Sequence, residues 1–383
     1  MNLSRTDDYA FLLRFAQLYY PVHLPLVTTL CVMGVIGHVM IFIVLTRKQV
    51  FGPINLMMMS LSMCQILLLI SYLYFSYLLL LAERHCITEF WRFGWVVSLL
   101  VSIDINIAVH STAVFHVLAL SIVRYVCIHK HAHRGRGSWL DLARAGRILC
   151  LLYGVIPTVL CAPVYLSSTV QATNTSETRH WCRVKELTFI PYQITFTSAP
   201  GTGFLFAFNF WFYAVACKLV PCVIVFCMSV LLVRKLRILR RRNARLVHRA
   251  SRRRRRYSCT TYLTLVVMSL FLLVEMPQSI LNLWAGLMGP RVLRHYSQIT
   301  DFTEMLTVFY SSVNFAIFCV MSSQFRQTFF QLFVVSGLEM AAATRDMIVT
   351  RVNYSRTSNT ANSLTSELGA LNRMSVKRCV SGV

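Results

Sequence analysis

Seven long stretches of this chain carry almost no charge, and this feature limits the possible folds more than any other. Five of them lack Asp, Glu, Lys and Arg altogether: residues 15–46, 49–82, 148–176, 187–217 and 305–325. Two more, residues 95–123 and 257–290, each contain one acid, Asp104 and Glu275. A helix needs about 20 apolar residues to cross a bilayer. The sequence therefore predicts an all-α membrane protein, a seven-transmembrane helix bundle.

Basic residues are concentrated in particular connections, and this predicts the orientation in the bilayer. Residues 234–256 contain thirteen Arg and Lys, and residues 129–147 contain five, whereas the other connections mix both signs. Short basic loops remain cytoplasmic. We therefore expect a multi-pass plasma-membrane protein with an extracellular N-terminus and a cytoplasmic C-terminus. The arginine run in residues 251–258 is interpreted as this topology signal, facing anionic lipid, rather than as a nucleic-acid site.

Three parts follow from this pattern. Residues 1–20 are predicted to form an extracellular N-terminal tail, residues 21–335 the seven-helix domain, and residues 336–383 a disordered cytoplasmic tail rich in Ser and Thr. Within the second part, residues 322–333 place Phe and Leu at helical spacing among polar residues, which predicts a short amphipathic eighth helix on the inner face.

Two pairs of residues belong to the side predicted to be extracellular. Cys86 and Cys182 are the cysteines of the outer loops, where an oxidising environment would allow a disulfide between them. Asn2 and Asn174 each begin an Asn-x-Ser triplet and are predicted glycosylation acceptors. The remaining cysteines lie mostly within the predicted helices, where they act as small apolar residues.

The sixth stretch contains the sequence FLLVEMPQSIL, in which Glu275, Pro277 and Gln278 interrupt an apolar run. A charged residue at mid-membrane depth costs about 2.5–3.5 kcal/mol, so Glu275 is expected to face the bundle interior. Pro277 removes a backbone hydrogen bond and is expected to kink the helix. We interpret the pair as a hinge below a polar floor. A locally satisfied buried acid remains the alternative for Glu275.

Further polar residues are predicted at the outer ends of two other helices. Asp301 and Glu304 begin the seventh, three residues apart and therefore on one face. Asp104, Asn106 and His110 lie on the outer half of the third. A cavity lined by these carboxylates predicts a cationic ligand, because a guanidinium pairs with a carboxylate in a fork.

The chain resembles a known family in several longer stretches. They are VLTRK (44–48), HSTAVF (110–115), VLCAPVYL (159–166), NFWFYAVACKLVPC (209–222), FLLVEMPQSIL (271–281) and NFAIFCVMSSQFRQTF (314–329), together with the Arg124-Tyr125 pair that ends the third helix. These stretches resemble rhodopsin-type G-protein-coupled receptors, most closely the invertebrate FMRFamide- and myosuppressin-type peptide receptors and the W class of nematode serpentine receptors.

This resemblance implies roles for several residues. The ligand would be a peptide ending in Arg-Phe-amide, and Trp211 would contact its aromatic ring. Arg124 and Tyr125 would contact a heterotrimeric G protein, while Pro277 and Pro221 would act as hinges. Phosphorylation of the Ser/Thr-rich tail would add about −1.5 to −2 charges per site, which would offer a contact for arrestin.

The sequence departs from the pattern of the wider superfamily at several positions. Val123 replaces the acid that usually precedes the arginine, Gln65 replaces the second-helix aspartate, and His38 replaces the first-helix asparagine. A chemosensory receptor for small odorants remains the alternative function. A transporter is disfavoured because no internal repeat is visible. No metal-ligand cluster, nucleophile motif or phosphate loop indicates catalysis or a cofactor.

Overall fold

Seven long apolar helices dominate the computed structural model, which describes residues 10–47, 51–83, 88–134, 140–173, 190–196, 203–244, 252–288 and 290–335. In that part of the chain, seven helices are long and apolar enough to cross a membrane. Their membrane segments are Pro21–Leu45, Pro53–Leu78, Phe93–His129, Leu142–Ser167, Phe208–Leu239, Thr261–Trp284 and Asp301–Met321. The predicted seven-helix bundle is confirmed, and the complete helices that contain these segments are called helices one to seven below.

Five of the seven are continuous α-helices and two contain a π-helical segment. The continuous ones are α1 (Ala10–Leu45), α2 (Pro53–Glu83), α3 (Phe93–Arg134), α9 (Arg252–Met288) and α10 (Pro290–Met321). Helix four consists of α4 (Leu142–Val155), the π segment Ile156–Leu160 and α5 (Ala162–Ser167). Helix five consists of α7 (Gly203–Phe212), the π segment Tyr213–Leu219 and α8 (Val220–Ala244). A 3₁₀ turn, Thr88–Trp91, precedes α3.

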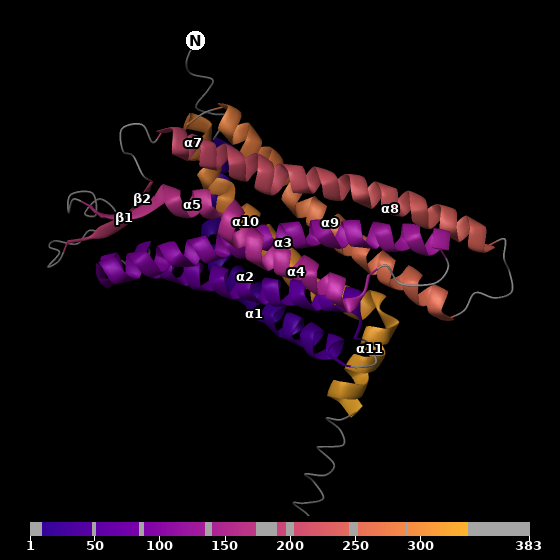
Figure 1. Ribbon diagram of the computed structural model, residues 1–383. Helices are drawn as coiled ribbons and strands as arrows, with labels where there is room; N and C mark the ends of the chain where they lie inside the picture. The colour runs from indigo at the N-terminus through magenta and orange to yellow at the C-terminus, as the bar shows by residue number, and fades with distance from the viewer. Residues whose placement is uncertain are drawn as a thin grey trace, which may run out of the picture. The chain divides into compact units, whose positions relative to one another are not determined.

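The long helices lie alongside one another (Figure 1), and their contacts connect six of them in a ring. α1 contacts α2 and α10, α2 contacts α3, α3 contacts α8, α8 contacts α9, and α9 contacts α10. α4 lies against α2 and α3. Apolar side chains of helices two, three, five, six and seven form one core cluster, and those of helices one, two and seven form another.

Helices one and seven approach closely at two glycines. A Cβ atom on Gly34 would lie 2.7 Å from the Ser312 Oγ, and one on Gly37 would lie 2.7 Å from the Phe315 Cβ. Small residues allow close backbone packing between helices in lipid, where van der Waals contact replaces the hydrophobic effect. The glycines therefore fix the position of helix seven against helix one.

A two-stranded hairpin was not predicted. β1 (Ser168–Ala172) pairs antiparallel with β2 (Tyr192–Phe196), with Thr169 opposite Thr195. The Phe93 and Tyr192 rings meet edge to face, with centroids 5.2 Å apart, which attaches the hairpin to the start of α3. We call this side of the bundle the hairpin end.

The hairpin corrects two predicted boundaries. The stretches 148–176 and 187–217 are both free of charge, but their adjoining ends form strands rather than helix. Helix five accordingly begins at Gly203 and its membrane segment continues to Leu239, past Arg234. The absence of charge does not distinguish a strand from a helix, which explains why the strands were not predicted. Helix five can continue past Arg234 because a long basic side chain can extend from a membrane helix toward water.

Several predicted features lie partly or wholly outside the described residues. These are the Cys86–Cys182 disulfide, the glycosylation acceptors Asn2 and Asn174, and the tail 336–383. α1 begins at Ala10, so described helix already occupies half of the predicted N-terminal tail. After helix seven, α11 (Ser323–Phe329) is followed by a π segment, Phe330–Val335, in the region of the predicted eighth helix. Its location on the inner membrane face stays a prediction.

Candidate functional site

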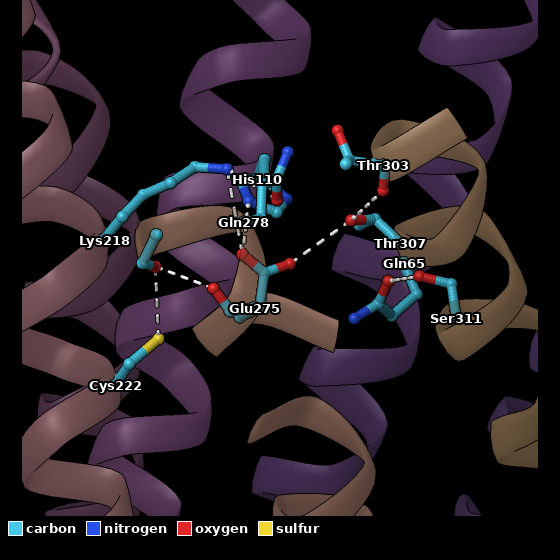
Figure 2. A network of polar contacts seen from close by, with 10 residues as sticks. Gln65, His110, Lys218, Cys222, Glu275, Gln278, Thr303, Thr307 and Ser311 are labelled. Atoms are coloured by element: carbon cyan, nitrogen blue, oxygen red, sulfur yellow. Dashed lines mark hydrogen bonds and ion pairs between the residues drawn. The ribbon is translucent and has the colours of Figure 1, made fainter. Parts of the chain in front are cut away.

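Glu275 lies at the centre of a buried polar network between helices three, five, six and seven (Figure 2). Its side chain is only 1 % exposed. One carboxylate oxygen, Oε2, lies 3.4 Å from the His110 Nε2 and 3.8 Å from the Lys218 Nζ. The other, Oε1, accepts a hydrogen bond of 3.3 Å from the Thr307 hydroxyl. The expected inward position of Glu275 is therefore what the structure shows.

Sequence reasoning missed Lys218, the cation of this network. It lies immediately after the charge-free stretch 187–217, so the charge pattern places it at the boundary of a helix rather than in the interior. The π segment Tyr213–Leu219 contains it, and the backbone N–H of Val220 donates to the Val215 carbonyl, five residues back. The wider turn leaves both Cys217 and Lys218 buried. The signal in the sequence is a lone lysine between two charge-free stretches, 187–217 and 219–233, three residues before Pro221.

Lys218 contacts helix six on both sides of Pro277. Its Nζ donates a hydrogen bond of 2.9 Å to the Gln278 Oε1, in addition to its ion pair with Glu275. The Nζ also lies 5.9 Å from the centre of the Tyr213 ring. Next to the proline, the Ser279 hydroxyl donates to the Glu275 backbone carbonyl at 2.7 Å. Gln278, a predicted ligand-binding residue, is thus a member of this network, and its partner is an internal lysine.

The pairing with Lys218 changes what Glu275 can do. The expectation of a cationic ligand assumed a carboxylate without an internal cation. In the structure, Lys218 and Glu275 together are formally neutral. Neutralising either one alone would leave a buried charge, which is costly, so both charges are expected to persist. A ligand cation would have to compete with Lys218 for Glu275.

A second polar cluster lies at the hairpin end between helices one, two and seven. Asp301 is close enough to His23 for a charge interaction, and Glu304 is within hydrogen-bonding reach of the Tyr72 hydroxyl. Burial, and then the Asp301 carboxylate, raises the pKa of the Tyr19 hydroxyl, so it remains a hydrogen-bond donor.

Aromatic rings surround this second cluster. The Phe302 ring meets those of Phe15 and Tyr19 edge to face, at 5.2 and 5.5 Å, and Tyr19 also meets His23 at 5.2 Å. The start of helix one therefore packs on the start of helix seven through rings. Asp301 and Glu304 form the cluster's carboxylate pair, and we call it the Asp301–Glu304 cluster.

The other predicted ligand residues are not brought into either cluster. Asp104 is near Cys161 and Tyr165 of helix four. The Asn106 amide donates to the Ser71 hydroxyl at 3.1 Å, which links helices two and three. Trp211 is 36 % exposed and meets Phe210 edge to face. The five predicted polar residues of helices three and seven thus do not share one site, and among them only His110 reaches Glu275.

Arg124, the residue expected to contact a cytoplasmic protein, is only 3 % exposed. α3 continues ten residues beyond it to Arg134, and the Tyr125 ring lies 6.0 Å from the His129 ring. The Arg124 side chain is therefore buried among the helices rather than extended along the surface. A G-protein contact through Arg124 would require the surrounding helices to move.

Two of the substituted superfamily positions, His38 and Gln65, share a hydrogen-bond partner, Ser311. The Ser311 hydroxyl donates to the Gln65 side-chain oxygen, and the His38 Nε2 bonds the Ser311 backbone carbonyl at 2.9 Å. All three residues are buried. Neutral side chains thereby join helices one, two and seven directly at this depth.

Seven helices that are long and apolar enough to cross a membrane surround a buried ionisable network, an arrangement that agrees with the family match. The family described as Serpentine type 7TM GPCR chemoreceptor Srw matches residues 25–336 of this chain. The chain belongs to this family. It is a G-protein-coupled receptor, and so a multi-pass membrane signalling protein rather than an enzyme, acting between a ligand and a heterotrimeric G protein.

Three relatives show the extent of the similarity. The G-protein coupled receptor dmsr-1 of Caenorhabditis elegans is 24 % identical over 82 % of this chain and 69 % of its own length. The sex peptide receptor of Drosophila melanogaster is 25 % identical over 87 % and 77 %. The sex peptide receptor-related protein 2 of Caenorhabditis elegans is 24 % identical over 92 % and 81 %.

Proposed function

We propose that this receptor is activated by an extracellular peptide with a C-terminal Arg-Phe-amide, and that it acts in the plasma membrane with its hairpin end outside. Two relatives are named for a peptide ligand or for relation to such a receptor, which supports a peptide as the ligand class. The concentration of basic residues in 234–256, away from the hairpin end, supports the orientation.

The carboxylate pair of the Asp301–Glu304 cluster is the observation that carries the ligand chemistry. Asp301 and Glu304 lie three residues apart on helix seven, whereas the Glu275 carboxylate already has Lys218 as its ion-pair partner. Because Lys218 pairs with Glu275, the cation of the ligand is assigned to the Asp301–Glu304 cluster. The surrounding Tyr and Phe rings suit both a guanidinium and an aromatic side chain.

Binding at this cluster would act on helix six through helix seven. Thr303 and Thr307 lie on the same helix as Asp301 and Glu304, and Thr307 bonds Glu275 beside Pro277. The proposed response is a pivot of helix six at Pro277, which frees Arg124 and Tyr125 to contact the G protein. A ligand shifts such an equilibrium only by its differential affinity for the two states.

The test is a G-protein activation assay with amidated Arg-Phe peptides on cells that display the tagged receptor. Each peptide is compared with a twin in which citrulline, a neutral isostere, replaces arginine. Asp301→Asn should lower the potency of the arginine peptide at least about tenfold, equivalent to 1.4 kcal/mol, and leave the citrulline twin unchanged. Silence across the peptide panel at normal surface density would refute the proposal.

A chemosensory receptor for small molecules is the second candidate, because the matching family is described as chemoreceptors. The site separates the two functions. An uncharged odorant does not form an ion pair with Asp301, so Asp301→Asn should leave its potency unchanged. A response confined to uncharged small molecules would favour this function over the peptide receptor.

A further inference from the structure

Lys218 bonds two residues of helix six that flank its weakest point. Glu275 precedes Pro277 by two residues, and Gln278 follows it by one. The ammonium group donates to the Gln278 Oε1 at 2.9 Å and lies 3.8 Å from the Glu275 Oε2. One side chain of helix five thus contacts both halves of helix six.

The backbone of helix six is weakened at this position. Pro277 has no N–H to donate to the Leu273 carbonyl four residues earlier, and its ring crowds the same turn. α9 nevertheless continues as one helix from Arg252 to Met288. Cross-helix bonds to the residues on either side of the proline replace part of the missing restraint, and Lys218 supplies two of them.

The position of Lys218 depends on its own helix. The π segment that contains it ends at Leu219, two residues before Pro221, so both contacting helices have a proline within three residues of the bond. π segments inside α-helices are frequent at functional sites. A return of this segment to α-helix would change the direction of residue 218 and withdraw the ammonium from helix six.

We propose that Lys218 is a staple across the hinge of helix six, which holds both halves in the unliganded arrangement and sets the basal activity of the receptor. The proposal rests on the pivot at Pro277 and not on the identity of the ligand. Release requires the loss of the Gln278 bond and a change of partner at Glu275. The staple is therefore a positioning device, and the ligand's binding groups lie elsewhere, in the Asp301–Glu304 cluster.

The experiment measures ligand-free nucleotide exchange on a panel of heterotrimeric G proteins, normalised to receptor at the cell surface. Gln278→Leu removes the neutral partner and leaves the ion pair, so folding is least disturbed. Basal exchange should rise at least about twofold, the lower end expected when coupled residues in contact are separated. Lys218→Met, which removes both contacts, should raise it further.

A double variant distinguishes the staple from independent effects. Lys218→Met with Gln278→Leu should match Lys218→Met alone, because Gln278 acts only through the lysine. Leu273→Ala is the matched control, since Leu273 lies beside the same proline but is 70 % exposed on the outer face of the helix.

The outcomes that overturn the staple are specific. Unchanged or lowered basal exchange in Gln278→Leu at normal surface density would overturn it, whether or not Lys218→Met reaches the surface. An equal rise in Leu273→Ala would also overturn it, because any change near the proline would then suffice. These results do not depend on the activation assay with Arg-Phe-amide peptides, because no ligand is added. A receptor that responds to none of those peptides would refute the proposed ligand and not the staple.

Discussion

The ion pair between Glu275 and Lys218 makes a quantitative prediction for stability. Both side chains are almost fully buried, at 1 % and 6 % exposure. Glu275→Gln keeps the shape but leaves the Lys218 ammonium without its carboxylate, and removing one partner of a buried pair typically costs about 3–5 kcal/mol. Lys218→Met should be similarly destabilising, because it leaves the carboxylate buried.

The double variant is expected to be far less damaged than either single one. Replacing both charged residues by packed uncharged side chains often changes the stability little. The coupling free energy between the two sites should therefore exceed about 2 kcal/mol. Thermal inactivation of the purified receptor in lipid nanodiscs measures all four proteins. In Glu275→Gln, the amide oxygen can still accept the Thr307 hydrogen bond. Each single variant therefore differs from the wild type mainly by the loss of one charge.

Two results would refute this reasoning. If Glu275→Gln is as stable as the wild type, the pair contributes nothing and the network is not organised by charge. If the two single effects add in the double variant, the residues do not interact across the helices.

Three further predictions follow from other contacts. Gly37→Ala should lower thermal stability by about 1–3 kcal/mol, because its Cβ would meet Phe315 at 2.7 Å, whereas Gly146→Ala, with open space around it, should not. Gln65→Leu should cost about 1–3 kcal/mol by leaving the buried Ser311 hydroxyl without its acceptor, which the same measurement detects. Val123→Asp should lower ligand-free nucleotide exchange, because the new carboxylate gives Arg124 an acidic neighbour that holds it away from the G protein. Unchanged exchange would contradict the proposal that Arg124 contacts the G protein.

The seven helices could be predicted from the sequence because the bilayer imposes a strict rule on length and charge. The same rule gave no information on the hairpin, since β1 and β2 are short, uncharged and separated by a long connection. The helix-five boundary moved for the same reason. Apolar composition describes the surroundings of a segment, while its conformation depends on backbone pairing.

The candidate site was only partly predictable. The inward position of Glu275 follows from the cost of a carboxylate in lipid. The structure places His110 and Gln278, two of the predicted ligand-binding residues, in the same network. The partner of Glu275 could not be inferred, because Lys218 reaches it only through the π segment before Pro221. Likewise Asp104 and Asp301 share an end of the bundle but lie on different sides of the ring, which helical spacing alone does not reveal.

The separation of an internal ion pair from a ligand-binding cluster is the central claim, and paired concentration–response curves test it most directly. An activating peptide is applied to cells expressing Asp301→Asn and Gln278→Leu at matched surface density. The account predicts a potency loss with unchanged baseline in Asp301→Asn, and a raised baseline with retained dependence on the peptide's arginine in Gln278→Leu. Identical curves for the two variants would contradict it.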